Sequence, residues 1–376
     1  MSPTQTFLDS LRPEIKNLPL YNAGVSSEYV RCNYHVQEVA KLGSNENSYG
    51  TSPKVLAAIA GAVPDVSLYP DPFGNELRVA LSERLNVTRD RLVLGNGSDD
   101  LIAVAVQTFL SAGDEVLTVT PSYGLHLIWP QSIGALVRAV PVKRDYTLDI
   151  NEFIAALTPR TRMIMFSNPS NPVGTSITAD DMSRLLSSVD DCTLIVFDEA
   201  YFEYAAADRS YPSFLQMLEQ SHLPWLLLRT FSKAYALAGL RIGYAVASDA
   251  ALIHLMDRVR GPFNVNRLAL VAGLVALEER EYVRECISRT SEERERMRRA
   301  LDALGYRPAP SLANFLFFDA REDSFQLTQR LLPHGVIVKP WREPGFTEHI
   351  RVSIGTPRAN DQFLTALGKV RLTPIA

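Results

Sequence analysis

A single lysine in apolar surroundings is the first candidate for chemistry in this chain. Lys233 follows the apolar run Trp225–Leu228, and Phe231, Ala234 and Tyr235 flank it. An ammonium group in such surroundings is costly unless it is paired, neutral or covalently bonded, and a lysine of this kind can form a Schiff base with a carbonyl compound. A structural lysine whose head reaches out of a core segment is the alternative interpretation. The other polar motifs must therefore decide between the two.

Three further polar motifs also follow apolar runs of strand length. The segment Asp198–Tyr201 places a carboxylate at the end of a buried strand, where it needs a cation or a strong donor. In the loop Ser167–Gly174, two prolines and a glycine hold Asn171 in one orientation as a hydrogen-bond donor. The segment Gly95–Asp100 joins two glycines and a serine suited to N-capping to the start of a helix, whose free amides bind anions. The last two motifs, taken singly, also fit ordinary turns.

The elements that must position these motifs alternate between strand and helix. Helical patterns separate most of seven apolar runs: Arg91–Leu94, Val116–Thr120, Leu136–Val142, Met163–Phe166, Leu194–Phe197, Leu226–Leu228 and Ile242–Val246. Buried strands alternating with helices predict an α/β fold with a mostly parallel sheet that is covered on both faces. Because such sheets bind ligands beyond the carboxyl ends of their strands, we expect the polar motifs to converge there.

The length of the chain, 376 residues, predicts one large domain and one smaller domain. Residues 1–45 form a polar, turn-rich N-terminal arm, which we expect to contribute to the small domain and to contact another subunit. Residues 46–265 contain the strand and helix alternation of the large domain. In residues 266–376, two helices, short strands and a last helix predict a smaller α+β domain.

Composition excludes several classes of function. A hydrophobic share of 46% and a charged share of 21% are ordinary for a soluble protein, and a net charge of -4 argues against a nucleic-acid surface. The three cysteines are far apart and the six histidines show no metal-ligand spacing, so no metal site is expected. No segment has the pattern of a signal peptide or the length of a membrane span. We therefore expect a cytoplasmic protein without nucleic-acid or membrane partners.

Taken together, the motifs match the requirements of one cofactor. They supply a lysine, an acid able to keep a ring nitrogen protonated, and amide and phenol donors. Helix amides at Gly97–Asp99, with Ser232 and Arg241, supply a phosphate site, where the helix dipole and charge-assisted bonds add. Pyridoxal 5′-phosphate requires this set, because its lysine adduct works as an electron sink when the ring nitrogen carries a proton.

The order of the motifs resembles that of the fold-type-I pyridoxal-phosphate aminotransferases, and within them the histidinol-phosphate aminotransferases. The resemblance covers the chain from about Leu11 to Leu367 and is carried by Lys41–Asn47, Tyr69–Pro72, Gly95–Asp100, Asn168–Gly174, Asp198–Tyr201, Phe231–Arg241 and Arg351–Thr356. It implies a large domain built on a mostly parallel, seven-stranded sheet and a smaller α+β domain.

The resemblance also implies roles for residues around the cofactor. Lys233 would bind the cofactor covalently and act as the general base, Asp198 would pair with the ring nitrogen, and Asn171 and Tyr201 would contact the ring oxygen. Tyr123 would stack on the ring. The phosphate would be held by Gly97, Ser98, Asp99, Ser232 and Arg241.

Other implied roles concern the second subunit and the substrate. Tyr69 matches a tyrosine that reaches the cofactor phosphate of the neighbouring subunit, which implies a homodimer with shared sites. Arg351 matches the arginine that receives the anionic group of the substrate, and Tyr21 and Asn45 match positions at the entrance. Lys339 stands where the family usually has a phosphate-binding arginine, and a lysine offers a point charge instead of a bidentate fork.

The expected activity is a ping-pong transamination between glutamate/2-oxoglutarate and histidinol phosphate/imidazole-acetol phosphate, as in histidine biosynthesis. An aromatic amino-acid aminotransferase acting on phenylalanine or tyrosine is the first alternative. A pyridoxal-phosphate-dependent decarboxylase of phosphorylated amino acids is another, because it would share every cofactor residue. A non-enzymatic binding module would have lost part of the cofactor set. A nicotinamide dehydrogenase is disfavoured, since no Gly-x-Gly-x-x-Gly motif follows a strand.

Overall fold

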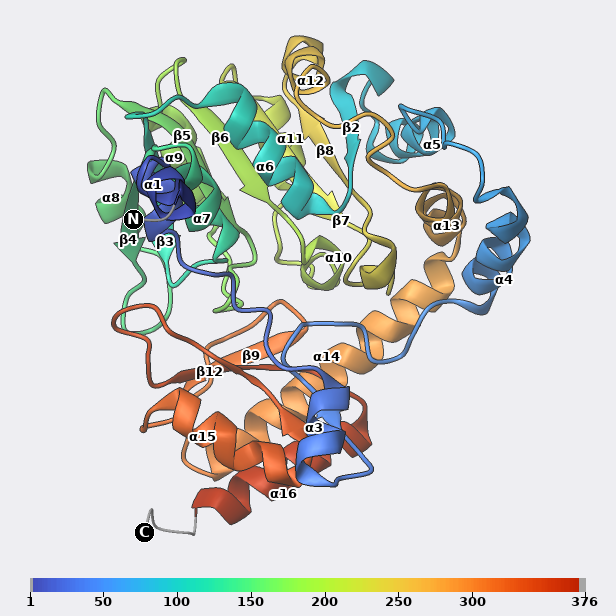
Figure 1. Ribbon diagram of the computed structural model, residues 1–376, viewed down its shortest axis with the longest axis vertical. Coiled ribbons are helices and arrows are strands. Elements are labelled where there is room, and N and C mark those ends of the chain that lie inside the picture. Colours follow the sequence, from blue (N-terminus) through green and yellow to red (C-terminus); the bar gives the residue numbers. More distant parts are fainter. Residues whose placement is uncertain (1–2, 372–376) are drawn as a thin grey trace.

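The computed structural model of the chain describes residues 3–371. Figure 1 shows a large domain around a central sheet, a smaller domain beside it, and helix α14 (Arg280–Ala303) running from one to the other. The central sheet has seven strands in the order β2-β8-β7-β6-β5-β3-β4. They are β2 (Leu92–Gly95), β3 (Glu115–Thr120), β4 (Leu136–Pro141), β5 (Thr161–Ser167), β6 (Leu194–Asp198), β7 (Trp225–Thr230) and β8 (Gly243–Ala247).

The central sheet is mostly parallel, as the alternation of strands and helices predicts. Strands β4, β3, β5, β6 and β7 pair in parallel, whereas β8 is antiparallel to both β7 and β2. In β6 every side chain is buried, and successive residues face opposite sides: Phe197 joins one apolar core and Val196 the other. The predicted α/β class and sheet are therefore confirmed.

Helices cover both faces of this sheet (Figure 1). One face packs against α4 (Pro53–Ala62), α5 (Asn75–Leu85), α8 (Ile150–Ala155), α9 (Ala179–Ser188), α10 (Phe202–Ala205), α11 (Phe214–Glu219) and α13 (Arg267–Glu278). The opposite face packs against α6 (Ser98–Phe109), α7 (Leu125–Ser132) and α12 (Ala250–Met256). The predicted cap of α4 is present, since the Ser52 hydroxyl accepts a hydrogen bond from the amide of Lys54 and Pro53 opens the helix.

The small domain has its own apolar core around a three-stranded antiparallel sheet. This sheet has the order β11-β12-β9, with β11 (Lys339–Pro340), β12 (His349–Ser353) and β9 (Phe315–Asp319). A parallel pair joins β1 (Ala40–Lys41) of the N-terminal segment to β10 (Val336–Ile337). The helices α15 (Ser324–Leu331), α16 (Pro357–Arg371) and the second half of α14 complete the core.

The change from one apolar core to the other falls inside α14. Helix α13 packs on α4 and α5, and its alanines belong to the large core. In α14, Val283 and Ile287 also join the large core, whereas Met297 and Leu301 join the small one. A sequence pattern shows that a helix has an apolar face, but it does not show which domain that face meets.

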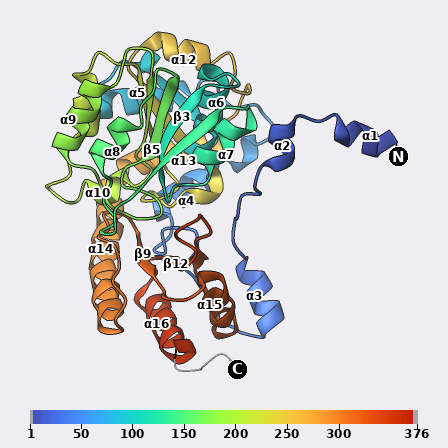
Figure 2. The same ribbon diagram turned by 90° about the vertical axis from the view of Figure 1, so that its left-hand side faces the viewer.

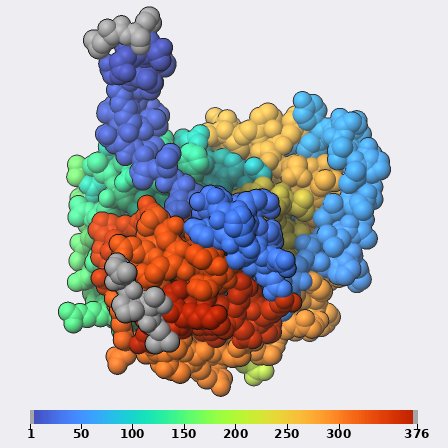
Figure 3. All heavy atoms as spheres, turned by 60° about the horizontal axis from the view of Figure 1, so that its bottom comes forward, coloured from blue at the N-terminus to red at the C-terminus, as the bar shows by residue number. Residues whose placement is uncertain are grey.

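The N-terminal residues divide into a projecting part and a packed part. Helix α1 (Pro3–Asp9) extends away from the body of the molecule in Figures 2 and 3, whereas α2 (Pro13–Asn17) lies beside α7. Helix α3 (Ser27–Tyr34) instead packs on the small domain, where Val30 meets Leu332 and Ile337. The sequence pattern predicts a polar, turn-rich segment over residues 1–45 and indicates neither α2 nor α3. Each is short, and α3 buries only Val30, which leaves little helical periodicity to detect.

Helices α12 and α15 were also not predicted. Both have fewer than nine residues and follow an aspartate, Asp249 or Asp323, that accepts a hydrogen bond from a backbone amide of the helix. Their caps were therefore visible in the sequence as start signals. Within residues 3–371, none of the helices combines the length and the apolar character that a membrane span requires.

Candidate active site

A pocket of about 740 Å³ lies between the two domains, beyond the carboxyl ends of β5, β6 and β7. Parallel sheets bind ligands at this edge, so the pocket lies where the sequence predicts a ligand site. The pocket brings together thirteen of the predicted site residues: Tyr21, Asn45, Ser98, Asp99, Tyr123, Asn171, Asp198, Tyr201, Ser232, Lys233, Arg241, Lys339 and Arg351. Of the remaining two, Gly97 borders it beside Ser98, and Tyr69 lies elsewhere.

Lys233 lies after β7, on the floor of this pocket. Its Nζ donates to the carbonyl oxygen of Ser44 at 3.4 Å and lies 5.8 Å from the ring centre of Tyr201. Burial, and next the positive charge of Arg351, lower the pKa of Lys233 to about 8. A larger fraction of this amine is thus neutral and nucleophilic near neutral pH than for an ordinary lysine.

Asp198 ends β6 and is buried opposite a histidine that sequence analysis did not single out. One carboxylate oxygen, Oδ1, accepts a hydrogen bond of 3.0 Å from the amide of Ala200. The other, Oδ2, lies 3.3 Å from Nε2 of His126, although the two atoms are not aligned as a regular hydrogen bond. His126 is fully buried on α7, and its ring meets that of Tyr123 edge to face. The available signal was its place three residues after Tyr123.

The predicted phosphate cradle is built from a backbone turn that requires glycine. Gly97 has φ of 89° and is the N-cap of α6. The sequence suggests Ser98 as the cap, but Ser98 is the first residue of the helix. The guanidinium of Arg241 pairs with Oδ1 of Asp99 at 2.6 Å and packs so closely on Gly97 that a Cβ there would collide with it. Small residues thus let Arg241 and the free helix amides converge on one point.

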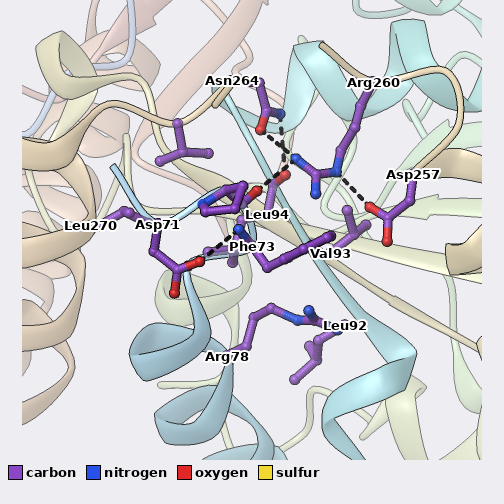
Figure 4. Close-up of a pocket in the computed structure, with 13 residues that line it drawn as sticks. Asp71, Phe73, Arg78, Leu92, Val93, Leu94, Asp257, Arg260, Asn264 and Leu270 are labelled. Carbon is purple, nitrogen blue, oxygen red and sulfur yellow. Dashed lines mark hydrogen bonds and ion pairs between the residues drawn. The ribbon is translucent and has the colours of Figure 1, made fainter. Parts of the chain in front are cut away.

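A network behind the cradle fixes its position, and Figure 4 shows the part of it that is formed by Asn264, Arg260 and Asp257. The carboxylate of Asp100 accepts hydrogen bonds from the amide of Asn96 at 2.8 Å and from Nδ2 of Asn264 at 3.0 Å. Asn264 in turn accepts from Arg260, which pairs with Asp257 at 2.5 Å. The cavity among these side chains is only about 10 Å³, about the size of one water molecule, so the network supports the cradle and is not a ligand site.

Arg351 lies on the opposite side of the pocket, in β12 of the small domain. It donates to Oδ1 of Asn171 at 2.6 Å and to the carbonyl oxygen of Gly43 at 2.8 Å, while its Nε has no partner among the described residues. Burial lowers the pKa of Arg351 from its usual value. Asn45 is buried nearby and donates to the hydroxyl of Tyr201 at 2.8 Å.

Lys339 and Tyr21 form the outer wall of the pocket. Nζ of Lys339 donates to the carbonyl oxygen of Asn22 and lies 5.7 Å from the ring centre of Tyr21. The ring of Tyr21 meets that of Tyr123 edge to face, with 6.1 Å between the ring centres. Burial, followed by the charges of Arg351 and Arg342, lowers the pKa of Lys339 to about 8.

Tyr69 is not part of the pocket of its own chain. Its side chain is 79% exposed and stacks on Phe263, with 4.6 Å between the ring centres. The two rings lie in a surface hollow formed by residues 66–70 and 262–268. Tyr69 is therefore available to a neighbouring molecule and not to the cofactor site beside Lys233.

Comparison with known proteins identifies the class of this enzyme. Residues 37–367 match the family model of aminotransferase class I and II, and the chain belongs to that family. This assignment agrees with the mostly parallel sheet and with the pocket, which is lined by a lysine, a buried aspartate and an arginine.

Individual relatives carry a narrower name. The chain is 46% identical to histidinol-phosphate aminotransferase 3 of Rhizobium meliloti (strain 1021), over 96% of this chain and 97% of that one. It is 43% identical to histidinol-phosphate aminotransferase 1 of Mesorhizobium japonicum, over 96% and 98% of the two chains. A crystal structure of histidinol-phosphate aminotransferase from Sinorhizobium meliloti, in complex with pyridoxal-5′-phosphate, superposes with a TM-score of 0.87 at 29% identity and covers 96% of this chain and 97% of that one.

Proposed function

We propose that this aminotransferase binds pyridoxal 5′-phosphate at Lys233 and exchanges an amino group between glutamate/2-oxoglutarate and histidinol phosphate/imidazole-acetol phosphate. The observation that carries the proposal is the shared pocket of Lys233, Asp198 and Arg351. It places a lysine with a pKa of about 8, a buried carboxylate and a buried guanidinium around one space. The complex reported for the Sinorhizobium meliloti structure supports the same cofactor.

The residues present fit the parts of this cofactor. Asp198 would pair with the ring nitrogen, Tyr123 would stack on the ring, and Asn171 and Tyr201 would contact the ring oxygen. The phosphate would be held by Gly97, Ser98, Asp99, Ser232 and Arg241, where a Cβ at Gly97 would fill the cradle. When bound, the cofactor supplies an electron sink that stabilises negative charge on the α-carbon of an amino acid.

The protein's own groups would then bind the substrate and move its proton. Arg351 would bind the anionic group of donor and acceptor in turn, through the guanidinium hydrogens that its bonds to Asn171 and Gly43 do not use. Lys233 would take a proton from the α-carbon and return it two atoms away, as a 1,3-proton shift requires, because its lowered pKa lets it act as a base near neutral pH. The bond from Asn45 holds the phenol of Tyr201 beside the same space.

A trapping experiment tests the role of Lys233. Borohydride reduction of the holoenzyme, followed by proteolysis and mass spectrometry, should find the cofactor as a secondary amine on Lys233. Lys233→Ala should yield no such adduct and should lose turnover by roughly 10³-fold or more. Lys54→Ala is the control, because that lysine is exposed and pairs with Glu279 far from the pocket. An adduct on another lysine would refute the assignment.

The names of the relatives and the charge of the pocket support histidinol phosphate as the substrate. Lys339, Arg342 and Arg351 all line the pocket and together favour a substrate with a dianionic group. Rapid-mixing spectra with histidinol phosphate and with phenylalanine should show conversion at least about 100-fold faster for the phosphate ester. A ratio near one would favour the aromatic enzyme. Release of carbon dioxide from phosphorylated amino acids would identify a decarboxylase instead.

A homodimer with shared sites is supported by two exposed apolar regions. One surrounds Tyr69 and Phe263, where Val66 and Leu68 are also exposed, and the other is α1 with Phe7 and Leu8. In such a dimer Tyr69 would reach the cofactor phosphate of the partner. Mixing inactive Lys233→Ala with cofactor-deficient Tyr69→Phe should restore activity, because one site of the mixed dimer then has both residues. No restoration would contradict shared sites. The three unpaired cysteines support a cytoplasmic location.

A further inference from the structure

The carboxylate of Glu343 joins the small domain to the large domain beside the pocket. Glu343 lies in the loop between β11 and β12 and lines the pocket wall. Its Oε2 accepts a hydrogen bond of 2.7 Å from the hydroxyl of Thr120, and the amide of Ser122 lies 3.1 Å from each carboxylate oxygen. Because Thr120 ends β3 and Ser122 lies just after it, this single side chain binds two groups of the other domain.

The same carboxylate is also bonded within its own domain. Nε1 of Trp341 donates to Oε1 of Glu343 at 3.1 Å. The ring of Trp341 is buried and lies 5.9 Å from the guanidinium of Arg351. Trp341 packs beside Arg351, and Ser122 directly precedes Tyr123. Glu343 therefore bonds to a neighbour of each of these two residues. These two residues line the pocket from opposite domains.

An apolar contact lies next to this polar junction. Val173 and Tyr146 of the large domain pack with Phe317, Trp341 and Phe346 of the small domain. Apolar contact is not directional and tolerates sliding, whereas hydrogen bonds to a carboxylate fix distance and angle. The apolar cluster therefore holds the domains together, and the hydrogen bonds of Glu343, with the bond from Arg351 to Asn171, set how they are placed relative to each other.

We propose that Glu343 is a positioning residue that keeps the small domain in register with the Thr120–Tyr123 segment. Without it, the bond from Arg351 to Asn171 remains but the link to the segment of Tyr123 is lost, so the arrangement that binds ligand is populated less. An apparent affinity falls in proportion to that population. Because donor and acceptor use the same pocket, both affinities fall together. This inference rests on the proposed function for its kinetic consequence alone.

Kinetics of three variants test the proposal. With saturating cofactor, Glu343→Ala should raise KM for glutamate and for the acceptor by a similar factor, roughly 5-fold to 50-fold, with a smaller change in kcat. Glu343→Gln should stay within about 3-fold of wild type, because an amide can still accept from Ser122 and Trp341 and donate to the Thr120 hydroxyl. Glu348→Ala, on an exposed residue of the same loop, is the control and should change neither value.

Hydrogen–deuterium exchange gives a readout that does not depend on activity. In Glu343→Ala the peptide containing the Ser122 amide should take up deuterium faster than in wild type, while peptides from β6 and β7 stay unchanged. Unchanged exchange at Ser122, or a rise in KM for only one of the two substrates, would overturn the proposal. If neither glutamate nor histidinol phosphate is turned over by the wild-type protein, the proposed function fails, and the exchange measurement still decides the role of Glu343.

Discussion

Nη1 of Arg351 donates a hydrogen bond of 2.6 Å to Oδ1 of Asn171, and this bond crosses from the small domain to the large one. It engages the amide oxygen of Asn171, so the amide nitrogen is the group left to donate to a ligand. Arg351 also donates to the carbonyl oxygen of Gly43. The arginine proposed to bind the substrate and the asparagine proposed to contact the cofactor thus hold each other.

Replacing Arg351 by lysine tests this arrangement. One ammonium group cannot reach both Asn171 and the carbonyl of Gly43 and still present a fork to an anion. We expect kcat/KM for donor and acceptor to fall by about 100-fold each, as for a truncated buried charge pair. Arg358→Lys, the same change on an exposed arginine of α16, should leave both values unchanged. Steady-state kinetics with each substrate in turn measures the effect, and an unaltered kcat/KM would contradict the role of the guanidinium.

Replacing Gly97 by alanine tests the phosphate cradle. The new Cβ would collide with the guanidinium of Arg241 and displace it from the helix start, so cofactor affinity should fall by about 10-fold or more. Gly113→Ala is a matched control, since Gly113 has φ of +88°, close to the +89° of Gly97, but has no atom within 4 Å of its Cβ position. Both variants should lose stability through backbone strain. Fluorescence titration of the apoproteins with pyridoxal 5′-phosphate should separate them, and equal affinities would argue against the cradle.

The class of fold and most of the pocket could be predicted because their signals are local. Asp198 is a polar residue that follows an apolar strand, and the carboxyl ends of parallel strands lie at one edge of the sheet. These two facts together suffice to place Asp198 beside Lys233. His126 was missed because its place three residues after Tyr123 is the one local signal, and that signal is weak. A histidine in an amphipathic helical pattern is normally interpreted as a core residue. Only the packing of α7 on the sheet brings His126 within 3.3 Å of Asp198.

Residues that act across the domain boundary were also beyond prediction from the chain alone. Glu343 lies in a polar loop, where a glutamate is normally solvated, and its partners Thr120 and Ser122 precede it by more than 200 positions. The cores that α13 and α14 join could not be predicted for the same reason, because the two helices differ in which core they meet and not in their periodicity. Pairings between distant segments are set by tertiary packing, which no local pattern records.

The lowered pKa of Lys233 predicts how the apoprotein takes up its cofactor. The neutral amine is the nucleophile, so the second-order rate should rise with pH and level off above about 8 instead of above 10. Arg351 contributes to the shift by its charge, so Arg351→Gln should move the midpoint to higher pH even where the rate is reduced. Stopped-flow absorbance between pH 6 and 9.5 measures both midpoints. The same midpoint in both proteins would show that burial alone sets it.

Lys339 predicts a pH-dependent preference for phosphorylated substrates. Its pKa is lowered to about 8, so its positive charge is present below that pH and is lost above it, while a phosphate ester is already doubly charged from about pH 6.5 upward. In the wild-type enzyme, KM for histidinol phosphate should therefore rise as pH passes 8. Lys339→Met should raise that KM about 10-fold at pH 7, remove the rise above pH 8, and leave KM for glutamate within about 2-fold. Initial rates from pH 6.5 to 9.5 give both profiles. If the profiles of variant and wild type run parallel, Lys339 does not bind the phosphate, and Arg342 becomes the residue to replace next.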